Sequence, residues 1–156
     1  MHRVIQVRED MTDYLTPEQR SMAMSRVKSK DTSLERLVRS ELHKQGYRFR
    51  KNVPTLPGKP DIVFVSARVV VFVDGDFWHG YHFQCWGFKL KPYWREKIET
   101  NRSRDLRNLC KLRRRGWKVL RVWGHEIKKD VHAVVQKIAT LVAQQKALAG
   151  NRGGTR

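Results

Sequence analysis

The residues best suited to chemistry follow one apolar run, Val69–Val73, and they are Asp74, Asp76 and His79. The run consists mostly of β-branched residues, which is typical of a strand buried on both faces of a sheet. Two carboxylates and an imidazole at the exposed end of such a strand can bind a hard cation and transfer a proton. The alternative is an Asp-Gly turn followed by aromatic residues of the core, and this stretch alone leaves both interpretations open.

A further carboxylate is expected beside Asp74. Residues 61–65 form a second apolar run, and three residues separate it from the run at 69–73, which is hairpin spacing. Because the two strands of a hairpin are antiparallel, Asp61 and Asp74 should lie at the same end of the sheet. Two acids at one sheet end favour a hard-cation site.

The elements that position these residues are predicted to form one domain. Residues 1–15 are expected to be a flexible N-terminal arm, 16–148 the folded domain, and 149–156 a disordered basic tail. Helices are predicted from Pro17, from Thr32 to Gly46, over 92–115 and over 128–147, and strands over 47–50, 61–65, 69–73 and 117–123.

Glu35 has two interpretations. It stands three residues after Thr32, so the pair reads as a capping box in which the carboxylate bonds back to the cap amide. It could equally serve as a further acid of the site. The connection over 80–91 is predicted to be a loop, and its composition is unusually aromatic for a connector.

Composition narrows the class of partner. The 156-residue chain is 40% apolar, and 33 Lys and Arg against 15 Asp and Glu give a net charge of +18, which predicts binding to nucleic acid. No apolar run approaches the roughly 20 residues of a bilayer span, and the N-terminus lacks the apolar core of a signal peptide. Cys85 and Cys110 form no disulfide framework, so we expect a reducing, cytoplasmic environment.

Taken together, the predicted fold class is α/β with a mixed α+β sheet, in the element order αβββαβ. That order, with Pro60-Asp61 at the start of a strand, resembles the single-domain, restriction-endonuclease-like core of PD-(D/E)XK nucleases, which has helices on both sides. Local motifs resemble more narrowly the very-short-patch-repair (Vsr) mismatch endonucleases. These motifs cover about residues 17–127, and they are Lys30-Asp31-Thr32 with Glu35; Leu56–Asp61; Val71–Gly75 with Phe77–Gly80; Tyr93-Trp94 with Lys97-Ile98, Asn101 and Arg104-Asp105; and Gly116–Trp123.

The resemblance implies a Mg²⁺-dependent enzyme that nicks one DNA strand 5′ to the thymine of a T·G mispair. It implies Asp61 as the principal Mg²⁺ ligand, helped by the backbone carbonyl of Val73. His79 would act as general base or acid. Asp74 would orient the water or complete the metal shell, a role that other members give to a histidine. Glu35 would be a more distant or second-metal carboxylate.

The resemblance also assigns a role to the aromatic residues. Phe77, Trp78 and Trp94 would be wedges inserted into the base stack beside the mispair, and Met24 would be a smaller wedge from the opposite groove. Unstacking is cheapest at a mismatch, which provides selectivity. For Trp94, a place in the core is the alternative, because inward-facing Ile98 follows it on the same helix.

A structural zinc is a further family feature. The available donors are Asp76, His82, Cys85 and His125, but their mixed types and irregular spacing give a zinc centre weak support. If the metal is absent, burial of loop aromatics must replace its cross-link.

The expected partners are double-stranded DNA and repair proteins, and no membrane association is expected. The protein is expected to be a monomer associated with the nucleoid. Two other functions remain open from the sequence. One is a restriction-type or mobile-element endonuclease that cuts unmismatched DNA, and the other is a non-catalytic DNA-binding module.

Overall fold

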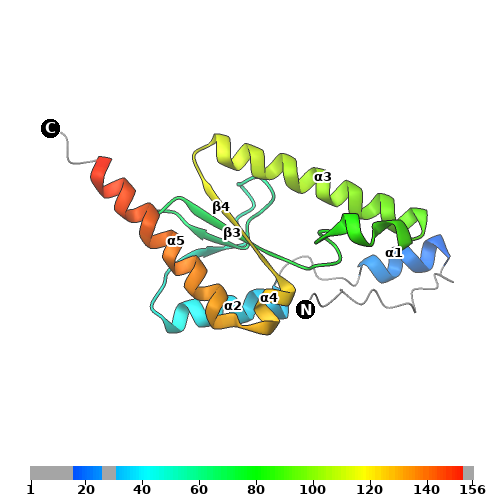
Figure 1. Cartoon of the computed structure of the whole chain (residues 1–156), viewed down its shortest axis with the longest axis horizontal. Coiled ribbons are helices and arrows are strands. Elements are labelled where there is room, and N and C mark those ends of the chain that lie inside the picture. Colours follow the sequence, from blue (N-terminus) through cyan, green and yellow to red (C-terminus); the bar gives the residue numbers. More distant parts are fainter. Residues whose placement is uncertain (1–15, 26–30, 153–156) are drawn as a thin grey trace.

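The structure is a computed structural model that describes residues 16–25 and 31–152, excluding the side chains of Arg20 and residues 23–25. The predicted N-terminal arm therefore lies outside the described residues. The elements are α1 (Pro17–Ser25), α2 (Ser33–Lys44), β1 (Arg50–Lys51), β2 (Ile62–Phe64), β3 (Val69–Asp74), the short 3-10 helices η1 (Phe83–Cys85) and η2 (Gly87–Lys89), α3 (Pro92–Arg114), β4 (Lys118–Trp123), α4 (Gly124–Lys129) and α5 (Val131–Arg152) (Figure 1).

One mixed sheet organises the domain, in the order β1-β2-β3-β4. Strands β2 and β3 pair antiparallel with Ile62 opposite Val71, which confirms the predicted hairpin. Strand β4 pairs parallel with β3, and Asp74 lies opposite Trp123 at the end of that ladder. Helix α3 makes the crossover that parallel pairing requires, so the end of β3 meets residues far along the chain.

The two sheet faces are covered by different helices, because alternate residues of a strand point to opposite sides. Ile62, Val71 and Val122 face α2, α4 and α5 in the main core. Val63 and Val70 face Leu112 of α3 on the other side. Figure 1 shows α3 on one side of the sheet and α2, α4 and α5 on the other. The predicted mixed α/β fold with helices on both sides is confirmed.

The C-terminal helical region differs from the prediction. The single helix expected over 128–147 is two helices, because Asp130 has extended backbone angles (φ −160°, ψ 95°) and its Oδ1 accepts a hydrogen bond from the N–H of Ala133. Asp130 thus ends α4 and caps α5. Residues 149–152, which the sequence assigns to a basic tail, are the last turn of α5, and 153–156 lie outside the described residues.

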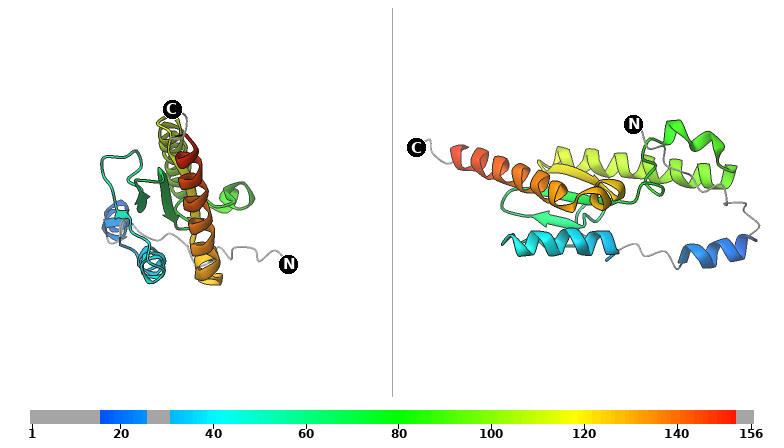
Figure 2. Two further views of the ribbon diagram at one scale, coloured as in Figure 1. Left: turned by 90° about the vertical axis from the view of Figure 1, so that its left-hand side faces the viewer. Right: turned by 60° about the horizontal axis from the view of Figure 1, so that its bottom comes forward.

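Local rules account for the first helix. Thr16 and Gln19 form a reciprocal capping box, since the N–H of each bonds to the side chain of the other at 2.9 and 3.2 Å. In Figure 2, α1 lies apart from the sheet and its covering helices. In the described part of the chain, no helix combines the length and apolar character needed to span a membrane.

Candidate active site

The site begins where β2 and β3 meet at one end of the sheet. Asp61 immediately precedes β2, and its Oδ2 accepts a hydrogen bond from the N–H of Val73 at 2.7 Å. The N–H of Asp61 in turn donates to the carbonyl of Val71. These two hydrogen bonds hold the Asp61 carboxylate next to the C-terminal end of β3, beside Asp74.

His79 lies between two carboxylates. Its Nδ1 is 2.6 Å from Oδ2 of Asp105 on α3, and its Nε2 is 3.6 Å from Oδ1 of Asp74. A carboxylate can only accept, so Nδ1 carries the proton that is donated to Asp105. The backbone that carries the imidazole is anchored as well, because Nδ2 of Asn101 donates to the carbonyl of Trp78 at 3.0 Å.

Arg121 of β4 joins the same group. Its Nε donates to Oδ2 of Asp74 at 2.5 Å, and its Nη2 lies 3.4 Å from Oδ2 of Asp105. The whole Asp74 residue is only 4% exposed to solvent, so its carboxylate needs a paired cation to remain charged at this position. Parallel pairing of β3 with β4 brings Arg121 to this end of the sheet.

Burial changes the acidity of each group. It raises the pKa of Asp61 to about 7; the charges of Glu35 and Asp74 act in the same direction, against the Val73 hydrogen bond. Burial also raises the pKa of Asp74, although His79 and Arg121 oppose it. Burial by itself lowers the pKa of His79, but the hydrogen bond to Asp105 and the charges of both carboxylates outweigh it, so this pKa is raised.

Glu35 lies at the start of α2 and is 2% exposed. Its carboxylate accepts the N–H of Asp31 at 2.8 Å and the hydroxyl of Thr32 at 3.1 Å, so the predicted bond to the cap amide of Thr32 is replaced by one to the preceding residue. Asp31 has a positive φ of 53°, which turns its N–H toward Glu35. Arg39 pairs with Asp31 at 2.7 Å and lies 3.6 Å from Glu35.

The aromatic residues gather beside the acids. Trp94 is 7% exposed within a cluster with Phe83, Trp86, Leu90 and Ile98, and half-buried Phe77 and Trp78 pack against that cluster. Phe77 stacks on Trp86 with ring centroids 5.5 Å apart, and Trp78 lies 6.0 Å from Trp94. Figure 2 shows this segment alongside the first half of α3. The side chain of Met24 lies outside the described residues.

The four zinc candidates do not come together. Asp76 is committed to His125, accepting its backbone N–H at 3.0 Å and its Nδ1 at 2.7 Å. His82 stacks on Tyr81, and Cys85 is exposed. Within the described ranges, no three His, Cys, Asp or Glu side chains form a group that could hold a metal ion. The residues present therefore do not fit a structural zinc.

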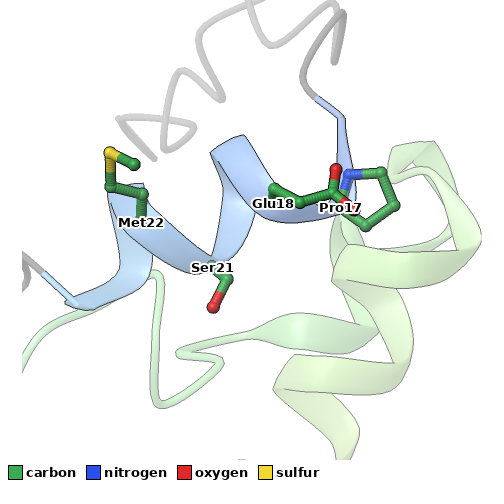
Figure 3. Close-up of a pocket in the computed structure, with 4 residues that line it drawn as sticks. All are labelled: Pro17, Glu18, Ser21 and Met22. Atoms are coloured by element: carbon green, nitrogen blue, oxygen red, sulfur yellow. The ribbon is translucent and has the colours of Figure 1, made fainter.

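A hollow on the surface of α1 lies outside the group of residues around His79. A hollow of about 520 Å³ is lined by Pro17, Glu18, Ser21 and Met22, all of which lie on α1 (Figure 3). None of them contributes to the group around His79. A duplex is too large for an enclosed pocket, so an open surface at the end of a sheet is the geometry expected for DNA.

Sequence reasoning missed the roles of two residues. Asp105 appeared only as part of a motif on α3, and Arg121 only as one cation among many. The available signal for Asp105 was its place on the apolar, sheet-facing side of an amphipathic helix, where an acid needs a partner. Arg121 carried a similar signal, because it interrupts an apolar strand.

This combination of a mixed sheet, a crossover helix and acids at the end of a central hairpin defines a restriction-endonuclease-like nuclease. The profile described as "DNA mismatch endonuclease Vsr" matches residues 12–85. The chain is 45% identical to the Type II nicking enzyme V.XorIIP of Xanthomonas oryzae pv. oryzae, over 85% of this chain and 98% of that protein. It is 37% identical to V.NmeDIP of Neisseria meningitidis (88% and 95% coverage) and 39% identical to the DNA mismatch endonuclease Vsr of Escherichia coli (72% and 74%).

The chain belongs to the Vsr DNA mismatch endonuclease family. It is an enzyme, a hydrolase that nicks DNA. Membership in this nuclease family implies dependence on a divalent cation.

Proposed function

We propose that this enzyme uses Mg²⁺ to nick one strand of a duplex 5′ to the thymine of a T·G mispair. One observation carries the proposal: the buried acids and His79 share a sheet end with the half-buried rings Phe77 and Trp78. Two members of the hydrolytic group, Asp74 and His79, therefore come from the same short segment, 74–79, as the pair of candidate wedges. Rings inserted at a weakened base step would present the adjacent phosphate to this group.

The residues present fit a hard divalent cation. Asp61 is a carboxyl group whose pKa is raised to about 7, with further negative charge from Glu35 and Asp74 nearby. Such a concentration of acid favours a bound cation, and Mg²⁺ needs only one or two carboxylates besides water and phosphate oxygens. Asp61 and the carbonyl of Val73 would hold it. When bound, the ion would stabilise the negative charge that develops on the phosphate.

His79 supplies the proton transfer. Because Nδ1 donates to Asp105, Nε2 is the nitrogen that takes a proton from the attacking water or gives one to the leaving oxygen. The hydrogen bond to Asp105 and the two neighbouring carboxylates raise the pKa of His79 despite its burial, so its protonated form is favoured relative to that of a free imidazole. Asp74 faces Nε2 at 3.6 Å, where it can orient the ring and a water beside it.

The packing of the rings is compatible with insertion into DNA. Phe77 and Trp78 pack at the edge of the aromatic cluster rather than inside it. Trp94 is buried, yet its Nε1 has no hydrogen-bond partner in the described structure. An unpaired buried N–H costs about 1–3 kcal/mol, which reduces the free energy needed to withdraw the ring toward DNA. The core role of Trp94 in the free protein and a wedge role in the complex are thus compatible.

A second candidate is nicking at a defined unmismatched sequence. It is favoured by the relatives from Xanthomonas and Neisseria, whose names describe nicking enzymes and mention no mismatch. The same catalytic group would serve both functions. Only the need for a weakened base step separates them.

The test is nicking of end-labelled duplexes that differ only in one pair, T·G, T·A or C·G, with Mg²⁺ or EDTA. We expect a cut 5′ to the mispaired thymine, none in EDTA, and none with Asp61→Asn. Equal nicking of the T·G and T·A duplexes would replace the mismatch proposal by the second candidate. Full activity of Asp61→Asn would remove the proposed cation site.

A further inference from the structure

Arg121 lies between the two carboxylates that contact His79. Its Nε bonds to Asp74 at 2.5 Å, and its Nη2 is 3.4 Å from the Asp105 oxygen that also accepts the proton of Nδ1 of His79. The remaining oxygen of Asp74 lies 3.6 Å from Nε2 of His79. The four side chains of His79, Asp74, Arg121 and Asp105 thus form a closed circuit in which each contacts two others.

The guanidinium of Arg121 is held firmly in this circuit. Its carbon lies 4.6 Å from the ring centre of Trp123, so one flat face is covered. Its side chain is 25% exposed, against 6% for Asp74 and 14% for Asp105. Partial burial strengthens charge-assisted hydrogen bonds relative to those of surface pairs.

We infer that Arg121 is a positioning residue for the nicking reaction, because it holds the two carboxylates at the distances that fix the orientation of the His79 imidazole. The inference rests on the proposed role of His79. Without the guanidinium, Asp74 and Asp105 would face each other across the imidazole with no fixed cation. The spacing of the two carboxylates would then no longer be fixed by a bridging side chain, and the imidazole of His79 would lose one or both contacts.

Arg121 also separates the roles of the two strand-end acids. Oδ2 of Asp74 is occupied by Arg121, whereas only Oδ2 of Asp61 has a hydrogen-bond donor among the described residues. Asp61 therefore retains an oxygen for the cation, and Asp74 is directed toward His79. Of the two roles expected of Asp74, this arrangement favours orienting the water over completing the metal shell.

Geometry, rather than charge alone, is the basis of the inference. The planar fork of arginine can reach two carboxylates at once, whereas a lysine ammonium is a point charge on a flexible stem. Arg121→Lys keeps the charge and loses the bridge, and Arg121→Met loses both. Arg36→Met removes one exposed cation from α2 and is the matched control for loss of charge.

The first measurement is single-turnover nicking at saturating protein, together with DNA affinity by fluorescence anisotropy. We expect Arg121→Met to lower the nicking rate about 100-fold, the lower range of proton-transfer catalysis, with a dissociation constant within about threefold of that of Arg36→Met. Arg121→Lys should recover less than a tenth of the lost rate. Wild-type rates for both Arg121 variants would overturn the inference.

The second measurement is the ¹⁵N spectrum of histidine-labelled protein without DNA, with His79 assigned from a His79→Asn sample. The wild type should show His79 protonated at Nδ1, and Arg121→Met should shift this signal toward a mixture of tautomers. A lower rate with an unchanged His79 signal would overturn positioning and indicate a direct contact with DNA. This readout needs no turnover, so it separates failure of the inference from failure of the proposed function.

A double variant serves as the control for loss of folding. Arg121→Met leaves Asp74 buried without its cation, which can lower stability by itself. Asp74→Asn with Arg121→Met removes the uncompensated charge. If this double variant is fully folded and still has a mixed His79 signal, the inference holds; recovery of the wild-type signal would overturn it.

Discussion

Nδ1 of His79, in the segment after β3, lies 2.6 Å from Oδ2 of Asp105, 26 residues away in the middle of α3. The pair joins the catalytic segment to the crossover helix and leaves Nε2 as the reactive nitrogen. Asp105→Asn should therefore lower single-turnover nicking about 100-fold, since the amide permits the wrong tautomer. Glu99→Gln, an exposed acid on the same helix, is the control and should nick at the wild-type rate. A rate for Asp105→Asn within threefold of the wild type would contradict an orienting role.

Asp61→Asn should abolish nicking and yet stabilise the metal-free protein. The pKa of Asp61 is raised from 3.8 to about 7 in the folded state, so stability is fully present below pH 3.8 and declines as the pH rises through 7. The amide avoids this loss, which amounts to at most about 4 kcal/mol.

The measurement for Asp61 is thermal unfolding in EDTA at pH 5 and pH 8. The variant should have the higher Tm at pH 8, with a smaller difference at pH 5. Adding Mg²⁺ should raise the Tm of the wild type more than that of the variant. A lower Tm for Asp61→Asn at pH 8 would show that its carboxylate stabilises the fold.

Trp78→Ala should reduce the preference for a mispair more than it reduces overall affinity. A wedge offsets an unstacking cost of a few kcal/mol, so its loss should lower the T·G to T·A nicking ratio at least tenfold. Phe88→Ala is the control, because Phe88 belongs to the same aromatic segment and is 66% exposed. Equal nicking ratios for the two variants would remove Trp78 from mismatch recognition.

His125→Ala should lower the free energy of unfolding by about 1.5–3 kcal/mol, the value of one hydrogen bond to a charged group. His132→Ala removes a 73% exposed histidine and should change it by less than about 0.5 kcal/mol. Because Asp76 and His125 already satisfy each other, a zinc chelator should leave the wild-type Tm unchanged. A fall in Tm on chelation, with zinc released, would contradict the metal-free pairing of Asp76 with His125.

DNA affinity should fall steeply with salt. Lys97, Arg104 and Lys111 are exposed and seven residues apart on α3, so they form one line along the helix. Replacing all three by Gln should reduce the slope of log affinity against log salt by up to about 3, one unit per lost phosphate contact. An unchanged slope would place the DNA on another surface.

Local rules predicted most of the helices and strands, and the predictions that were wrong failed for local reasons. The hairpin of β2 and β3 was predictable because turn spacing and apolar runs act within about fifteen residues. The break at Asp130 was missed because one capping aspartate stopped a helix whose apolar period continues on both sides. At Glu35 the capping box was recognised, but the left-handed backbone of Asp31 redirected the bond.

Sequence alone therefore determined the basic charge, the mixed fold and the meeting of Asp61 with Asp74, because each depends on composition or on neighbouring segments. Tertiary structure decided the partners of His79. Asp105 and Arg121 reach it only because α3 crosses the sheet and β4 pairs parallel with β3. The pairing of Asp76 with His125 likewise joins residues 49 positions apart. Such contacts depend on how distant elements pack, and no local pattern specifies them.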